Sequence, residues 1–239
     1  MIGVTEAAKR SKTDEAVDAL AEMIRSGRFT VGDKLPTEPE LVDELGVSRG
    51  ALREAVQALA FVGVLRVRQG DGTYVSGLEP SQLLRSVGFA LDLSSPETLA
   101  ELYGVRRILE PVATGMAARH MTASQIGAAR VQLDAMRDAA DAEGFVLADA
   151  AFHDEIAAAC GNEALRALLV SLRSESARAR IRRARDDDGA TARTVAEHEA
   201  ILAALEAGDA ELAQAAATLH LAEGERWLRR SVEQDRETT

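Results

Sequence analysis

The stretch from Leu35 to Val75 constrains this chain more than any other, because the spacing of its apolar residues changes twice within a short distance. Two segments with helical spacing are separated by a tight turn, and two short β-type runs follow around a glycine-rich tip. This order is typical of a winged helix-turn-helix, which places one helix in the major groove of DNA. We therefore predict a DNA-binding domain over residues 13–77, with its first helix over residues 13–27.

The first helix of the helix-turn-helix pair has signals at both ends. Thr37 and Glu40 have the spacing of a capping box, and Gly46 suits the left-handed conformation that ends many helices. Its apolar face consists of Leu41, Val42 and Leu45.

The second helix begins after Ser48, a residue that caps helices well. Arg49 and Arg53 are four residues apart, so they share one face near the start of this helix. The arginine fork can bind both acceptors of a guanine edge. A plain alternative is that both arginines are solvated surface charges, but the capping, turn and wing signals together favour DNA contact. The core face is expected to consist of Leu52, Val56 and Leu59.

The two β-type runs, residues 64–67 and 73–75, alternate as in a hairpin with Gly70, Asp71 and Gly72 at its tip. Small residues at a tip let the backbone approach a phosphate or a minor groove. We therefore include Gly70 and Gly72 among the expected DNA contacts, with Ser48 and the two arginines.

These motifs resemble the GntR family of bacterial transcription regulators, in the FadR-like branch that carries an all-helical FCD effector domain. The resemblance implies that Arg49 and Arg53 read an operator and that Gly70 supports the wing contact. One departure is Pro39, which stands where the family usually has an arginine and removes one expected DNA contact. The matching segments are 35–38, 40–41, 46–49, 52–55 and 70–75.

Composition predicts a cytoplasmic protein of two domains. No apolar run is long enough to span a membrane, no signal peptide opens the chain, and the single Cys160 suits a reducing compartment. The net charge is −11, and most of the acidic excess follows residue 78. An acidic body is compatible with DNA binding if the basic groups gather on one face.

The second part of the chain has no strand pattern from Gln82 onward and is rich in alanine, which predicts a helical bundle of six or seven helices over residues 82–232. Whether residues 81–93 form one helix stays open. A flexible start over residues 1–12, a linker over 78–81 and a tail over 233–239 complete the expected organisation. The expected breaks between helices are 94–96, 121–122, Gly144, 161–162, 186–189 and 208–209.

Histidines are the second informative feature. Asp149 and His153 are four residues apart, so both side chains point the same way on a helix, whereas His198 and His220 belong to later helices. A carboxylate and imidazoles from several helices of a bundle suit a divalent ion. Spacing alone favours only the Asp149–His153 pair, because each histidine can equally be a surface or core residue. His120 has no obvious companion.

The resemblance extends this prediction. Many FCD domains carry an Asp-x-x-x-His followed by two further histidines that bind zinc, nickel or a similar metal, and Asp149, His153, His198 and His220 occupy the corresponding places. The family effector is often a small organic acid beside the metal. Arg106 matches an arginine that often faces this pocket and can clamp a carboxylate. Alternatively, Arg106 pairs on the surface of its own helix with Glu101 or Glu110, of which only Glu110 has the ideal spacing.

Together these features and the resemblance predict a homodimeric regulator, a repressor that its effector releases from an inverted-repeat operator. The sequence does not determine whether the effector releases or activates the regulator, so activation by the effector stays open. One alternative is a metal-dependent hydrolase or isomerase. However, no separate general base or nucleophile motif is evident, and the winged domain would be unexplained, so we predict no enzyme. A further alternative keeps the DNA binding, but the metal either has a purely structural role or is itself the signal.

Overall fold

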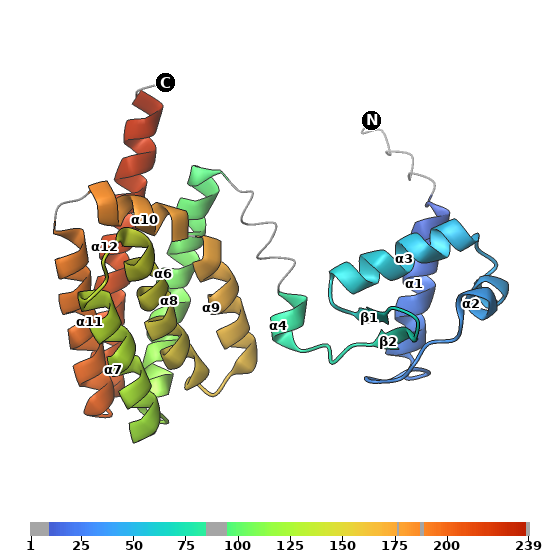
Figure 1. The fold of residues 1–239 in the computed structure, drawn as a ribbon, viewed down its shortest axis with the longest axis horizontal. Helices are drawn as coiled ribbons and strands as arrows, with labels where there is room; N and C mark the ends of the chain where they lie inside the picture. The colour runs from blue at the N-terminus through green and yellow to red at the C-terminus, as the bar shows by residue number, and fades with distance from the viewer. Residues whose placement is uncertain (1–9, 85–94, 176, 187–188, 238–239) are drawn as a thin grey trace, which may run out of the picture. The chain divides into compact units, whose positions relative to one another are not determined.

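The computed structural model describes residues 10–84, 95–175, 177–186 and 189–237, and the chain divides into two compact units, Met1–Ser86 and Val87–Thr239 (Figure 1). The described residues are mainly helical with one small sheet, which confirms the predicted fold class. Among these residues, no helix is both long and apolar enough to cross a lipid bilayer.

The first unit has the element order of a winged helix-turn-helix. Its apolar faces enclose one core, in which Leu20, Leu52 and Leu59 are buried. The unit contains α1 (Lys12–Arg25), α2 (Glu38–Leu45), α3 (Arg49–Phe61), β1 (Leu65–Arg68), β2 (Gly72–Val75) and the short α4 (Pro80–Leu83).

Local capping explains where α2 and α3 begin and end. The Glu40 carboxylate accepts from the backbone N–H of Thr37 at 2.7 Å, as in a capping box, and Gly46 ends α2 with φ 63°. Ser48 Oγ then accepts from Ala51 N at 3.1 Å and starts α3. Pro39 lies in the first turn of α2, where its missing N–H costs no helical hydrogen bond.

The hairpin of the wing is antiparallel and pairs Leu65 with Val75 and Arg68 with Gly72. Gly70 has φ 76° at the turn, a conformation that favours glycine. Lys34 Nζ lies 3.4 Å from the Asp71 carboxylate, so a basic side chain from the preceding connector reaches the wing tip. The wing is formed as the sequence predicts.

The second unit is a helical bundle without a strand in its described part. Seven helices are described there, but they do not decide between the two expected numbers, because that choice depended on residues 81–93. They are α6 (Pro96–Ala118), α7 (Ala123–Arg137), α8 (Ala142–Ala158), α9 (Glu163–Glu175), α10 (Ala177–Asp186), α11 (Ala190–Glu206) and α12 (Ala210–Glu237). The helix considered over residues 81–93 lies mostly outside the described residues.

Several boundaries differ from the sequence prediction: α4 occupies Pro80–Leu83, partly within the expected linker over residues 78–81, and α12 continues to Glu237, within the expected tail over residues 233–239. Gly144 does not break a helix: it lies in the first turn of α8, and its N–H donates to the Asp141 carboxylate at 2.7 Å. The prediction was wrong because Asp141 is a strong N-cap three residues earlier. The division between α9 and α10 was not predicted, since no glycine or proline marks it.

The bundle core surrounds α8, which packs against α6, α7, α9 and α10. Phe152 of α8 is fully buried, with Leu133 of α7 and Ile201 and Leu205 of α11 in the same cluster. Helices α6 and α12 pack closely as well, because Gly224 leaves room for the Tyr103 ring. These contacts bring α8, α11 and α12 together around one interior point.

Candidate functional site

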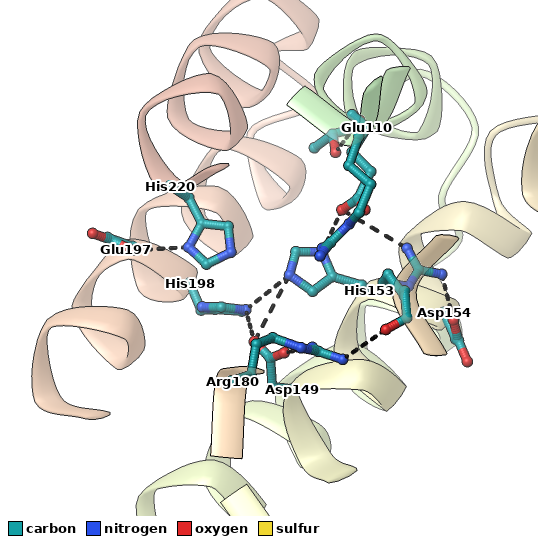
Figure 2. A network of polar contacts seen from close by, with 11 residues as sticks. Glu110, Asp149, His153, Asp154, Arg180, Glu197, His198 and His220 are labelled. Atoms are coloured by element: carbon teal, nitrogen blue, oxygen red, sulfur yellow. Dashed lines mark hydrogen bonds and ion pairs between the residues drawn. The ribbon is translucent and has the colours of Figure 1, made fainter. Parts of the chain in front are cut away.

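Asp149, His153, His198 and His220 converge inside the helical unit, as the sequence analysis anticipated (Figure 2). Asp149 and His153 lie one turn apart on α8, His198 is on α11, and His220 is on α12. All four side chains are buried, and one ligand atom from each lies within 4.8 Å of the others. His120 is exposed in the turn that follows α6 and takes no part.

Hydrogen bonds behind two of the rings fix where their protons lie. His198 Nδ1 is 2.7 Å from the Thr194 carbonyl oxygen, which can only accept, so Nδ1 carries the proton. His220 Nδ1 donates in the same way to Glu197 Oε2 at 2.8 Å. In both neutral rings Nε2 therefore presents a lone pair, the arrangement that metal-binding histidines use.

The spacing of the facing atoms suits a small cation. His198 Nε2 lies 3.2 Å from His153 Nε2 and 3.1 Å from Asp149 Oδ1. In a tetrahedral zinc site with bonds of about 2.0–2.1 Å, neighbouring ligand atoms are roughly 3.3 Å apart. Nitrogen and carboxylate donors that converge in this way suit Zn²⁺ or Ni²⁺. The donor set therefore fits a divalent ion.

The charge states of the site agree with this fit. Burial pushes the pKa of Asp149 upward, but Arg180 and His198 outweigh it and hold that pKa well below its usual value. Burial also lowers the pKa of His153 well below its usual value and lowers the pKa of His220. An ionised aspartate and neutral histidines are the forms that bind metals.

A further carboxylate lies behind His153. Glu110 Oε2 is 3.5 Å from His153 Nδ1, and Glu110 Oε1 accepts from Arg106 Nε at 2.7 Å. Burial raises the pKa of Glu110, but Arg106 and Arg173 outweigh that effect and lower it to about 2. A buried, ionised carboxylate therefore faces Nδ1 of His153 without a hydrogen bond to it.

A small cavity, of about 30 Å³ for the centre of a water-sized sphere, adjoins the four side chains and shares Asp149 and His220 with them. Three arginines line it together with apolar and threonine side chains: Arg106 of α6 and Arg180 and Arg183 of α10. Arg106 lines this cavity and also pairs with Glu110, but both side chains are buried, so this pair does not lie on the helix surface as the sequence alternative had it. A cavity with this lining is suited to a small anion.

Sequence reasoning missed several residues of this region. Arg180 binds the second oxygen of Asp149, and Glu197 holds His220. Glu197 directly precedes His198, which was a signal for a polar cluster. The arginines of α10 resemble an exposed charged helix in the sequence, so nothing there indicated that Arg180 and Arg183 face the interior.

The DNA-binding candidates lie on the first unit. Arg49 is exposed at the start of α3, and Arg53 is 67% exposed with its Nε 2.9 Å from Glu38 Oε2 of α2. Ser48 uses its hydroxyl to cap α3. Gly70 and Gly72 lie in the hairpin, at the turn and at the start of β2. The helix start and the wing are thus both presented to solvent.

Two family models match the chain. The model for "Bacterial regulatory proteins, gntR family" covers residues 12–75, and the FCD domain model covers residues 101–223. The chain belongs to the GntR family. It is therefore a transcription regulator of the GntR type with an FCD domain, and not an enzyme.

Known transcription regulators are similar in sequence or in structure to this chain over most of its length. The HTH-type transcriptional regulator LutR of Bacillus subtilis is 34% identical over 83% of this chain and 93% of its own length. The galactonate operon transcriptional repressor of Escherichia coli is 26% identical over 92% and 97%. Among solved structures, Streptococcus agalactiae GntR has a TM-score of 0.57 at 28% identity and covers 90% of this chain and 99% of its own.

Proposed function

We propose that this GntR regulator is a homodimeric repressor whose helical domain binds a small carboxylate beside a divalent metal ion. The observation that carries the proposal is the buried group of Asp149, His153, His198 and His220 next to an arginine-lined cavity. The lone pairs of these buried oxygen and nitrogen atoms would repel one another without a metal ion, whereas a cation between them relieves that repulsion.

In the DNA-binding domain, Arg49 and Arg53 contact base edges and phosphates, and Ser48 supports the start of α3. Gly70 and Gly72 let the wing backbone approach the DNA. Two recognition helices of a dimer bind an inverted-repeat operator, because two-fold symmetry in the protein requires it in the DNA. Both arginines are exposed, which supports this assignment.

In the helical domain, Asp149 and the three histidines hold zinc or nickel. The Glu197 carboxylate orients His220 through Nδ1, which keeps Nε2 of His220 free of a proton. The Glu110 carboxylate lies 3.5 Å from Nδ1 of His153. The bound ion supplies positive charge and open coordination positions beside the cavity. Arg106 lines that cavity and stabilises a carboxylate there.

The effector acts by preferring one arrangement of the dimer. The dimer has one arrangement that fits the operator and another that does not. A ligand releases the repressor only if it binds the second arrangement more tightly than the first. The galactonate operon transcriptional repressor carries the word repressor in its name, and that name concerns galactonate, a sugar acid. Both points support a repressor that responds to a small acid.

A second candidate function keeps the DNA binding but makes the metal itself the signal, or purely structural. The burial of all four ligand candidates favours this reading as well as the first. The cavity distinguishes them, because a metal sensor needs no arginine-lined space next to its ligands.

Selection of binding sites from a pool of random DNA duplexes tests the DNA half. We expect an inverted repeat, and we expect Arg49→Ala to abolish its enrichment. Elemental analysis then tests the metal half: His153→Ala should lose the ion, whereas His120→Ala, an exposed histidine outside the site, should retain it.

Release from the selected operator is then measured with small carboxylic and sugar acids, before and after chelation. Release by an acid only when metal is present supports the proposal. Release by metal addition alone supports the metal as signal. A metal-free wild-type protein that still responds to an acid would contradict the metal-anchored pocket.

A further inference from the structure

The three arginines that line the cavity differ in how their charge is compensated. Arg106 pairs with Glu110 at 2.7 Å and lies over the Tyr103 ring, and Arg180 pairs with Asp149. Arg183 is 9% exposed, and its Nε and Nη2 are buried with no hydrogen-bond partner in the described part of the chain. Arg183 is thus a buried cation for which the described residues provide no acidic partner.

A buried guanidinium without a partner destabilises a fold, because the lost hydration is not replaced. A ligand that brings a negative charge into the cavity would replace the lost hydration of this guanidinium. We propose that Arg183 is the residue that binds the oxyanion of the effector, a carboxylate or a phosphate, through its guanidinium fork. This inference rests on the proposed function. It assigns the binding of the effector's anionic group to Arg183 of α10, whereas the sequence had pointed to Arg106 of α6.

The position of Arg183 suits this role. It lines the same cavity as Asp149 and His220, so a ligand held at Arg183 extends toward the metal-binding side chains. A threonine hydroxyl pair, Thr191 and Thr194 of α11, lines the cavity as well and can bind neutral polar groups of a ligand. The cavity thus combines an anion anchor, a polar wall and a metal-binding end.

The same helix carries a natural reporter. Arg182, next to Arg183 on α10, donates to Ser231 Oγ of α12 at 2.8 Å and lies 5.7 Å from the centre of the Trp227 ring. Trp227 is the single tryptophan of the chain. A ligand that draws Arg183 into a hydrogen bond shifts α10 against α12 and changes the emission of Trp227.

Arg183→Met tests the assignment with a side chain of similar length and no charge. The full-length, metal-loaded protein is titrated with acetate, D-gluconate and inorganic phosphate, with neutral acetamide as reference, by tryptophan fluorescence and thermal melting. We expect at least one anion to bind saturably and acetamide to have no effect. In Arg183→Met the anion should bind roughly 10- to 100-fold more weakly, the loss expected for charge-assisted hydrogen bonds.

The matched control is Arg185→Met, an exposed arginine of the same helix that pairs with Glu143, and it should bind the anion like the wild type. Without ligand, Arg183→Met should melt at the same or a higher temperature than the wild type, so loss of binding will not reflect unfolding. Metal content should not change.

Wild-type anion affinity in Arg183→Met would overturn the assignment and leave the proposed carboxylate effector intact. Binding of phosphate alone, lost in Arg183→Met, would support Arg183 and contradict the carboxylate. An absence of any anion response in the wild type would overturn both.

Discussion

Glu197 Oε2 lies 2.8 Å from His220 Nδ1, on the side of the ring that faces away from His153 and His198 (Figure 2). Glu197 and His198 are neighbours in the chain, so α11 supplies one ligand candidate and also the carboxylate that orients another, on α12. This contact fixes the ring of His220 and raises the basicity of its Nε2.

Glu197→Ala is therefore expected to weaken metal binding by about 10- to 100-fold, the usual cost of removing a carboxylate behind a metal-binding histidine. Glu197→Gln keeps an acceptor and should lose less. Competition against a chelating dye measures the affinity. Glu199→Ala, an exposed residue on the same helix, serves as the control. Equal affinities for the Ala variants at 197 and 199 would count against the role of Glu197.

Arg53 and Glu38 offer a test of DNA recognition, because their ion pair joins α3 to α2. Arg53→Ala should weaken operator binding by roughly 10- to 100-fold, as expected for loss of one arginine–base contact. Glu38→Gln removes a negative charge beside this arginine and should strengthen binding modestly. Fluorescence anisotropy at two salt concentrations measures both effects, with Arg137→Ala in the helical unit as a control of equal charge change. Weaker binding by Glu38→Gln would show that Glu38 positions Arg53 for DNA.

Gly224 gives a prediction about packing. A methyl group at this position would overlap the hydroxyl of Tyr103 and lie 2.8 Å from its Cζ. Gly224→Ala should therefore destabilise the helical unit by about 1–3 kcal/mol, even though alanine normally stabilises a helix interior. Gly127→Ala, in α7 with nothing within 4 Å, should instead stabilise it by about 0.5–1 kcal/mol. Thermal or urea unfolding measures both, and two changes of the same sign would contradict the close packing of α6 on α12.

Metal removal should affect the helical unit selectively. The four ligand candidates belong to α8, α11 and α12, so a bound ion joins three helices of that unit alone. An ion present at about 100 times its dissociation constant stabilises the folded state by about 2.7 kcal/mol. Trp227 emission reports only on this unit, and its unfolding midpoint should fall on chelation. His153→Ala should show no response to the chelator; a full response in that variant would place the metal elsewhere.

The winged domain could be predicted in detail from the sequence, because its signals are local. Thr37 with Glu40, Gly46 and Ser48 act within one turn of the chain, and the structure confirms each cap. The helical domain was predictable in class, but the break expected at Gly144 was wrong, because Asp141, three residues earlier, caps α8 and places Gly144 in its first turn.

The convergence of the four metal-ligand candidates could be predicted only in part. The helical repeat placed Asp149 beside His153, whereas His198 and His220 approach them through tertiary packing that no local spacing encodes; only the family resemblance pointed to them. The arginines of α10 were not predicted, since a polar, arginine-rich helix normally lies in solvent. Burial of Arg183 can be recognised only when α8, α10 and α11 are seen together.

The ion pair between Arg180 and Asp149 has a consequence for the protein before it meets any metal. A guanidinium already neutralises the single carboxylate of the ligand group, so an incoming ion must compete with Arg180 for Asp149. If the proposed function holds, transcription from the regulated promoter would depend on the concentrations of both the ion and the acid. The two would be linked through the Asp149 carboxylate, which the ion and Arg180 share.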